Sequence, residues 1–191
     1  VSEGNPEVAK HPMKRSECWD IRERAGLHAD AKLEELEANE RLCGARHMAP
    51  LGVKDAGKPV EVCIDQYEFP NIPCEYPLVY PSAQEASQLC RAVGKRLCDA
   101  HEWEGACQGR LESPDYRFDL AAGVSPNAAV ERMRAAHNRA HAATKRWSYG
   151  PEYQRGVCAA GSSKSPGCQG GGWNQCGSNT YPAGSFPYCR S

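Results

Sequence analysis

Two absences limit what this sequence can be. No apolar run approaches the ~20 residues that a helix needs to cross a bilayer, so the sequence predicts no membrane span. Lys and Arg together number 23 against 24 Asp and Glu, which is a formal net charge of −1 over 191 residues. Without a basic excess, the composition does not favour nucleic acid or an anionic membrane as a partner.

Several functional motifs are also missing. The sequence contains no N-x-[ST] glycosylation acceptor, no internal repeat and no spacing typical of a Ser-His-Asp or Cys-His catalytic arrangement. The glycines at 170–172 lack the flanking strand and helix that a phosphate loop requires. Close C-x2-C pairs, which are typical of zinc sites, are absent because at least seven residues separate any two cysteines.

Cysteine is what the sequence has in abundance, with 11 residues. Thiols at this density are hard to keep unpaired outside a reducing compartment, so the sequence predicts disulfides and a secreted or periplasmic location. A first residue other than Met, Val1, agrees with removal of a signal peptide. The odd count requires at least one cysteine that is free or bonded outside the chain. The candidates for disulfides within the chain are Cys18, Cys43, Cys63, Cys74, Cys158, Cys168, Cys176 and Cys189.

Two local pairings are expected, although sequence alone does not determine connectivity. Cys18 and Cys43 bracket a helix expected over residues 28–42, so these two cysteines could pair with each other. Residues 156–189 carry eight glycines and four cysteines with no helical or strand period. Such a loop-rich stretch needs covalent support, and Cys158–Cys168 or Cys168–Cys176 would provide it.

The first half of the chain predicts an arm followed by mixed structure. Residues 1–48 read as an N-terminal arm, extended over 1–12, with a charged helix over 28–42 that carries a narrow apolar stripe at Leu33 and Leu36. Residues 60–67 alternate and are rich in β-branched side chains, which predicts a strand. A second short strand is expected over residues 78–80.

Two short helices follow, each with its own start signal. Ser82 with Glu85, and Asp99 with Glu102, have the spacing of a capping box. Gly94 and Gly109 are expected to end these helices. Their apolar faces are expected to be buried, and consist of Ala86, Leu89, Cys90 and Val93 on the first helix and Trp103, Ala106 and Cys107 on the second.

A longer helix is expected from Ser125-Pro126 to about residue 144, with Val130, Met133, His137 and Ala140 as its apolar stripe. His137 and His141 lie four residues apart, so both could reach one metal ion. However, the Glu of a zinc-protease helix is absent, and only two candidate ligands are apparent. We therefore favour core or surface histidines over a metal site here.

Residues 62–109 carry a motif pattern that resembles the formylglycine-generating enzyme, or sulfatase-modifying factor, family. The pattern comprises a strand motif, a second strand that matches loosely, and two helices. The residues of these helices match the family in order and spacing, without an insertion. The matching residues are Ile64, Asp65, Tyr67, Glu68, Phe69, Pro70, Asn71, Pro77, Leu78, Val79, Glu85, Ala86, Leu89, Cys90, Gly94, Lys95, Arg96, Leu97, Glu102, Trp103, Glu104, Ala106 and Gly109. Later matches are the turn at 147–150 and the segment 182–187.

The resemblance implies an α+β fold, an irregular, disulfide-rich C-type-lectin-like domain with little regular secondary structure. Residues 49–191 would form the N-terminal portion of that domain, with an inserted helix at about 125–145. The resemblance also gives Lys95-Arg96 a structural role, and Glu102 reads as a capping residue. The sequence departs from the family pattern at Cys98 and Asp99, where the family usually has Pro and Thr.

The family segments that this sequence lacks bear on its function. The family's "GNVWEW" and "RGGSW" segments are absent, as is the late cysteine pair that binds copper(I) in the enzymes. Family members join the cysteines matching Cys90 and Cys107 to cysteines in the C-terminal part. We therefore expect both to bond to a second chain, the C-terminal part of the same precursor, within a larger assembly.

Two functions follow from this reading. The favoured one is a non-catalytic extracytoplasmic structural or recognition subunit completed by another chain. The alternative is the N-terminal part of a copper-dependent oxidase acting on peptide cysteine, with the catalytic cysteines on a separate C-terminal chain. A structural calcium is possible by resemblance, although the region around 158–160 lacks side-chain oxygens. The segment 173–175 only faintly resembles a lectin calcium motif, so a calcium-dependent lectin is disfavoured.

Overall fold

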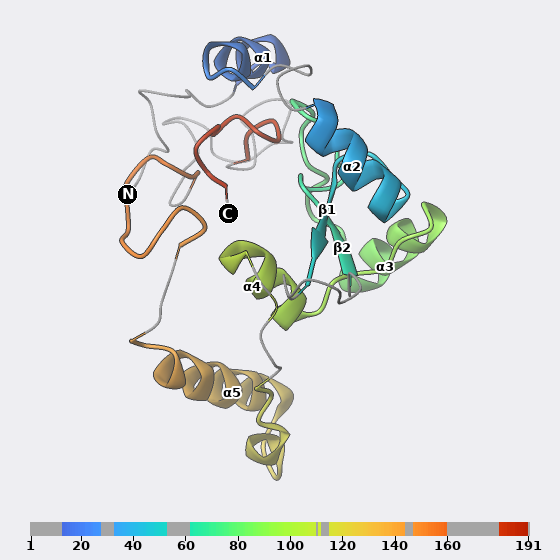
Figure 1. The fold of residues 1–191 in the computed structure, drawn as a ribbon. Helices are drawn as coiled ribbons and strands as arrows, with labels where there is room; N and C mark the ends of the chain where they lie inside the picture. The colour runs from blue at the N-terminus through green and yellow to red at the C-terminus, as the bar shows by residue number, and fades with distance from the viewer. Residues whose placement is uncertain are drawn as a thin grey trace, which may run out of the picture.

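The computed structural model of the chain describes residues 13–27, 33–52, 62–109, 111, 115–143, 147–159 and 180–190 (Figure 1). Over these residues the fold is α+β, with five α-helices, one 3-10 helix and a two-stranded antiparallel sheet. The α+β class expected from the sequence is therefore confirmed. In the described part of the chain, every helix is too short or too polar to cross a membrane.

The elements follow one another in a simple order. They are α1 (Arg15–Arg24), α2 (Leu33–Cys43), β1 (Met48–Leu51), β2 (Val62–Asp65), α3 (Ala83–Ala92), α4 (Ala100–Gln108), η1 (Phe118–Ala121) and α5 (Pro126–Ala140). β1 and β2 pair antiparallel with Ala49 opposite Ile64. The expected helices over 28–42 and 125–144 and the strand over 60–67 correspond to α2, α5 and β2.

The helix start signals read from the sequence are confirmed. The Ser82 hydroxyl accepts a hydrogen bond from the Glu85 N–H, and the Glu85 carboxylate accepts one from the Ser82 N–H at 2.8 Å. Asp99 and Glu102 repeat this exchange at 2.9 and 3.0 Å. Each capping box satisfies amide groups that the first helical turn leaves without partners. Gly109 ends α4 in the left-handed conformation, with φ 79°.

The buried core joins the two ends of the described chain, which the sequence did not indicate. Its side chains come from residue 13, α1, the loop after β2 and the segment 180–190, and are Met13, Cys18, Ile21, Cys74, Tyr181 and Phe186. Residues 1–26 show little hydrophobic periodicity, so α1 was not predicted. Within α1, the buried Cys18 and Ile21 are three residues apart on one face. The division of the chain at residue 48 stays a prediction.

Backbone hydrogen bonds tie the C-terminal segment to the loop that precedes α3. The Cys74 N–H donates to the Ala183 carbonyl and the Ala183 N–H donates to the Glu75 carbonyl, both at 2.8 Å. Arg15 of α1 forms an ion pair with Glu75. In Figure 1 α1 and the C-terminal segment lie together at one end of the molecule, and α5 with η1 forms the opposite end.

Three disulfides support this arrangement, and their connectivity differs from the pairings expected. They are Cys18–Cys74, Cys43–Cys63 and Cys158–Cys189. The expected pairing of Cys18 with Cys43 is wrong, because α1 packs on the loop holding Cys74 while α2 packs beside the sheet that holds Cys63. Cys158–Cys168 is likewise not formed. Cys168 and Cys176 lie outside the described residues.

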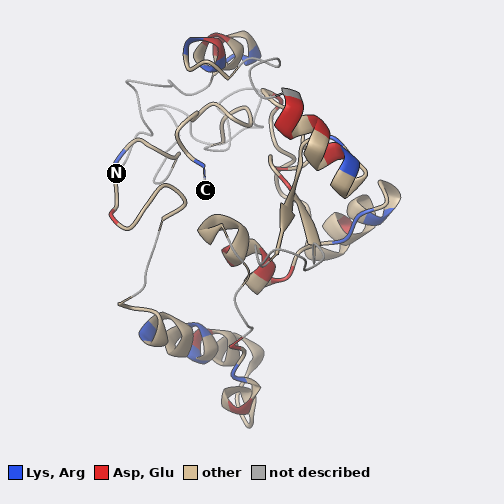
Figure 2. Ribbon diagram, viewed as in Figure 1, with Lys and Arg blue, Asp and Glu red and all other residues tan. Residues whose placement is uncertain are grey.

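One expected strand does not form. Residues 78–80 are irregular, and the Leu78 N–H donates to the Phe69 carbonyl at 2.8 Å rather than to a neighbouring strand. Tyr80 has φ 65°, which takes the backbone out of the extended region. Charged side chains of both signs occur on several elements, including α1, α2 and α5 (Figure 2).

Candidate functional site

Two ion pairs fix the start of α4 relative to the sheet. Lys95 Nζ lies 2.5 Å from the Asp65 carboxylate at the end of β2. The Arg96 guanidinium binds both oxygens of Glu102, at 2.8 and 2.5 Å. These hydrogen bonds lower the pKa of the Glu102 carboxyl to about 2. The structural role expected for Lys95-Arg96 and the capping role of Glu102 thus agree with the observed contacts.

Asn71 organises the turn that leads away from β2. Its side-chain amide donates to the Asp65 carboxylate and the His47 carbonyl, each at 3.0 Å, and its Oδ1 accepts from the Tyr67 N–H at 3.2 Å. The residue is buried and has φ 63°, a conformation that asparagine tolerates better than most residues. The start of this loop is therefore held by specific polar contacts, before the chain reaches Cys74 in the apolar core.

The apolar face of α3 is not buried, which contradicts the expectation from its periodicity. Leu89 and Val93 are both exposed, Val93 by 53%, and no residue of the helix is buried. Ala86 and Cys90 on the same face are half-buried. The periodicity correctly places these side chains on one face, but periodicity does not show whether another segment covers that face.

α4 shows the same discrepancy. Trp103, expected on the inner face, is 62% exposed, and Cys107 one turn further on is half-buried. The buried residues of α4 are Glu102 and Gly105 instead. The buried face of α4 is therefore the one that carries Glu102 and Gly105, and the largest apolar side chain of the helix, Trp103, lies in solvent.

Three cysteines in the described residues form no disulfide, namely Cys90, Cys98 and Cys107. Desolvation, reinforced by the carboxylate of Glu104, raises the pKa of the Cys107 thiol. Desolvation and nearby carboxylates, Glu102 foremost, likewise raise the pKa of Cys98. Because the thiolate is the reactive form, these two thiols are poorly suited to act as nucleophiles at neutral pH.

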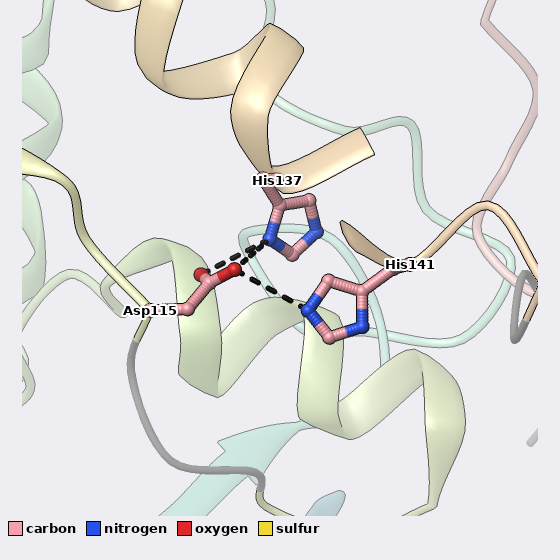
Figure 3. A group of neighbouring side chains, drawn as sticks. All are labelled: Asp115, His137 and His141. Atoms are coloured by element: carbon pink, nitrogen blue, oxygen red, sulfur yellow. Dashed lines mark hydrogen bonds and ion pairs between the residues drawn. The ribbon is translucent and has the colours of Figure 1, made fainter. Parts of the chain in front are cut away.

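A separate cluster of polar side chains lies between α4 and α5. Asp115, His137 and His141 each present a potential ligand atom, and these atoms all lie within 4.8 Å of one another (Figure 3). His137 Nδ1 is 2.8 Å from Asp115 Oδ2, and His141 Nε2 is 3.3 Å from the same oxygen. Asp115 precedes η1, and it is a member of the cluster that sequence reasoning missed.

A fourth group approaches the cluster from α4. Glu104 Oε2 lies 3.5 Å from His137 Nε2, on the side of the ring opposite Asp115. Although desolvation opposes ionisation of Asp115, hydrogen bonds and charge from His137 and His141 hold its pKa below the ordinary value. The carboxylate is therefore ionised at neutral pH and faces both imidazoles. No sequence signal places Asp115 there, because the chain must first fold back after α4.

At the positions where the resemblance suggested a structural calcium, Cys158 is in a disulfide and Ala159 packs against the apolar core. Neither side chain carries an oxygen, and the calcium expectation stays a prediction. The segment 173–175, singled out for its faint lectin motif, lies outside the described residues. Comparison of the chain with protein-family models, curated proteins and solved structures finds no match in any of the three.

Proposed function

We propose that this chain is a non-catalytic extracytoplasmic subunit with a structural or recognition role, completed by a second polypeptide. One observation carries the proposal. α3 and α4 each expose an apolar face, and each face bears a half-buried cysteine that forms no disulfide, Cys90 on α3 and Cys107 on α4.

The exposure is unusual for short amphipathic helices. Such a helix gains most of its stability by burying its apolar face, because short helices are marginal by themselves in water. In the described part of the chain Val93 and Trp103 are exposed, so their helices lack that stabilisation. A second polypeptide that covers both faces would supply it, since burying apolar surface contributes about 25 cal/mol per Å².

The two thiols indicate how the second polypeptide would be held. Six other cysteines in the described residues are oxidised to disulfides, which is typical of proteins in an oxidising, extracellular-type compartment. In such a compartment a paired state is also favoured for Cys90 and Cys107. Under the proposal both bond to cysteines of the second polypeptide, which by the family resemblance is the C-terminal part of the same precursor.

The resemblance further suggests that the assembled domain has a C-type-lectin-like fold and acts in the periplasm or outside the cell. The alternative, a copper-dependent oxidase acting on peptide cysteine, would place its copper-binding pair on the second polypeptide. Within this chain, the raised pKa values of Cys98 and Cys107 favour thiols that are structural rather than reactive.

The test is a disulfide map of the native protein. Free thiols are alkylated under denaturing, non-reducing conditions, and the digested peptides are identified by mass spectrometry. We expect Cys90 and Cys107 in peptides that are disulfide-linked to sequences not found among these 191 residues. Alkylated Cys90 and Cys107, or bonds from them to Cys168 and Cys176, would contradict the proposal. Cysteine-peptide-dependent oxygen uptake by the copper-loaded native assembly would favour the oxidase.

A further inference from the structure

We propose that Asp115, His137 and His141 form a binding site for a divalent transition-metal ion, with Zn²⁺ as the best-matched metal. The three ligands lie outside the α3 and α4 faces that carry the proposed function. The spacing of His137 and His141 allowed a metal ion, but the sequence offered only two ligands, and the structure adds Asp115 as the third. Its basis is the convergence of two imidazoles and one carboxylate from two separate segments on one point (Figure 3).

The separations of the ligand atoms suit a tetrahedral ion. Zinc–nitrogen and zinc–oxygen bonds of about 2.0–2.2 Å place neighbouring ligand atoms about 3.3 Å apart. His137 Nδ1 and His141 Nε2 lie 2.8 and 3.3 Å from Asp115 Oδ2, and all three ligand atoms are within 4.8 Å of one another. Side-chain rotations that shorten the widest of these separations, at most 4.8 Å, to about 3.3 Å would therefore bring all three to bonding distance.

The position of Glu104 matches the support that metal-bound histidines commonly have. Glu104 Oε2 lies 3.5 Å from His137 Nε2, so this carboxylate can accept the Nε2–H of the neutral ring. That tautomer leaves the Nδ1 lone pair directed at Asp115. A carboxylate behind a ligating imidazole fixes the tautomer and makes the ring a stronger ligand.

The competing explanation uses protons in place of a metal ion. Without a metal ion, each neutral ring can donate one N–H to the Asp115 carboxylate, His137 through Nδ1 and His141 through Nε2. A divalent ion would instead bind the lone pairs of these same nitrogens and an Asp115 oxygen, and its charge would balance Asp115 and Glu104. Titration with metal distinguishes the two arrangements, because only the second takes up an ion.

The ligand set selects the class of metal. Two imidazoles and a carboxylate suit zinc and the neighbouring late first-row metals rather than calcium or magnesium, which prefer oxygen. His141 is 48% exposed on its side-chain surface, so water can supply the fourth ligand. Asn138 follows His137, where a zinc-protease helix has its Glu. We therefore infer a site that clamps α5 to the segment before η1, not a hydrolytic centre.

The test is metal titration of the whole chain. The protein is treated with chelator, its free thiols are alkylated so that cysteines cannot bind metal, and ZnCl₂ is titrated by calorimetry near pH 7.5. Co²⁺ is titrated in parallel, because its visible absorption reports both coordination geometry and thiolate ligation. We expect one equivalent of Zn²⁺ and a tetrahedral cobalt spectrum without a thiolate band.

Three variants make the outcome decisive. His141→Ala removes a half-exposed ligand and should abolish binding, while circular dichroism checks that the fold is kept. Glu104→Gln should weaken binding about tenfold, the lower end of the effect of removing a carboxylate that supports a ligand. His101→Ala is the matched control, since His101 Nδ1 lies 2.6 Å from Asp99 without a second imidazole, and should leave binding unchanged. Absence of zinc binding, or full binding by His141→Ala, would overturn the proposal.

Discussion

Neutralising Glu102 should destabilise the fold in a pH-dependent way. The substitution Glu102→Gln keeps the side-chain length, and its amide oxygen can still accept the Asp99 N–H that caps α4. It removes the charge that binds Arg96, and it replaces the oxygen that accepts from Arg96 Nη2 with an NH₂ group that cannot accept. The pKa of Glu102 falls from 4.5 to about 2, chiefly because of its hydrogen bonds to Arg96.

The magnitude follows from that shift. A difference of this size between the folded and unfolded states corresponds to about 3 kcal/mol. Glu102 is only 8% exposed, but the Arg96 side chain is 64% exposed, so screening by water lowers the effect. We expect Glu102→Gln to reduce the free energy of unfolding by about 1–2 kcal/mol at pH 7.

The pH dependence gives the sharper test. Because the folded pKa lies below the unfolded value, the stabilisation is complete above pH 4.5 and is lost as the pH falls from 4.5 towards 2. Unfolding is measured in urea, which adds no salt. The difference in the free energy of unfolding between wild type and Glu102→Gln should fall to about half of its pH 7 value near pH 3. The control Glu131→Gln changes an exposed carboxylate of α5 and should show no such trend. An equal difference in the free energy of unfolding at pH 7 and pH 3 would refute the reasoning.

Two further substitutions test the core between the chain ends. Replacing Cys18 and Cys74 by alanine should lower the free energy of unfolding by about 3–4 kcal/mol, because their bond closes a sequence separation of 56 residues; a loss under about 1 kcal/mol in urea unfolding would contradict this. Gly184→Ala should cost about 1–2 kcal/mol by the same measurement, since φ is +79° and a Cβ would lie 2.4 Å from Arg22 Nη1. Unchanged stability of Gly184→Ala would show that Arg22 and the backbone adjust freely.

The parts of the fold that were predictable are those decided by local chemistry. Ser82, Asp99 and their partners three residues later start α3 and α4 as expected, because capping depends only on side chains within one turn. Pro126 at the first turn of α5 acts in the same local way. The alternation of β-branched residues likewise located β2.

What could not be predicted depends on contacts between distant segments. The burial of α1 requires the C-terminal segment, and the Cys18–Cys74 bond requires the loop after β2. Asp115 meets His137 across 22 residues, so no spacing rule connects them. Periodicity named the apolar faces of α3 and α4 correctly, but it describes a face and not the segment that covers it.

The packing of α1 against the C-terminal segment has a consequence for biosynthesis. Met13 and Ser185, which contact each other in the core, are 172 residues apart. At ordinary rates of translation the second emerges roughly 10–30 s after the first. During that interval Cys43 emerges before Cys74, the partner of Cys18 in the folded protein. The first partner available to Cys18 is therefore a non-native one, and any Cys18–Cys43 bond made at that stage must be exchanged before the final connectivity is reached.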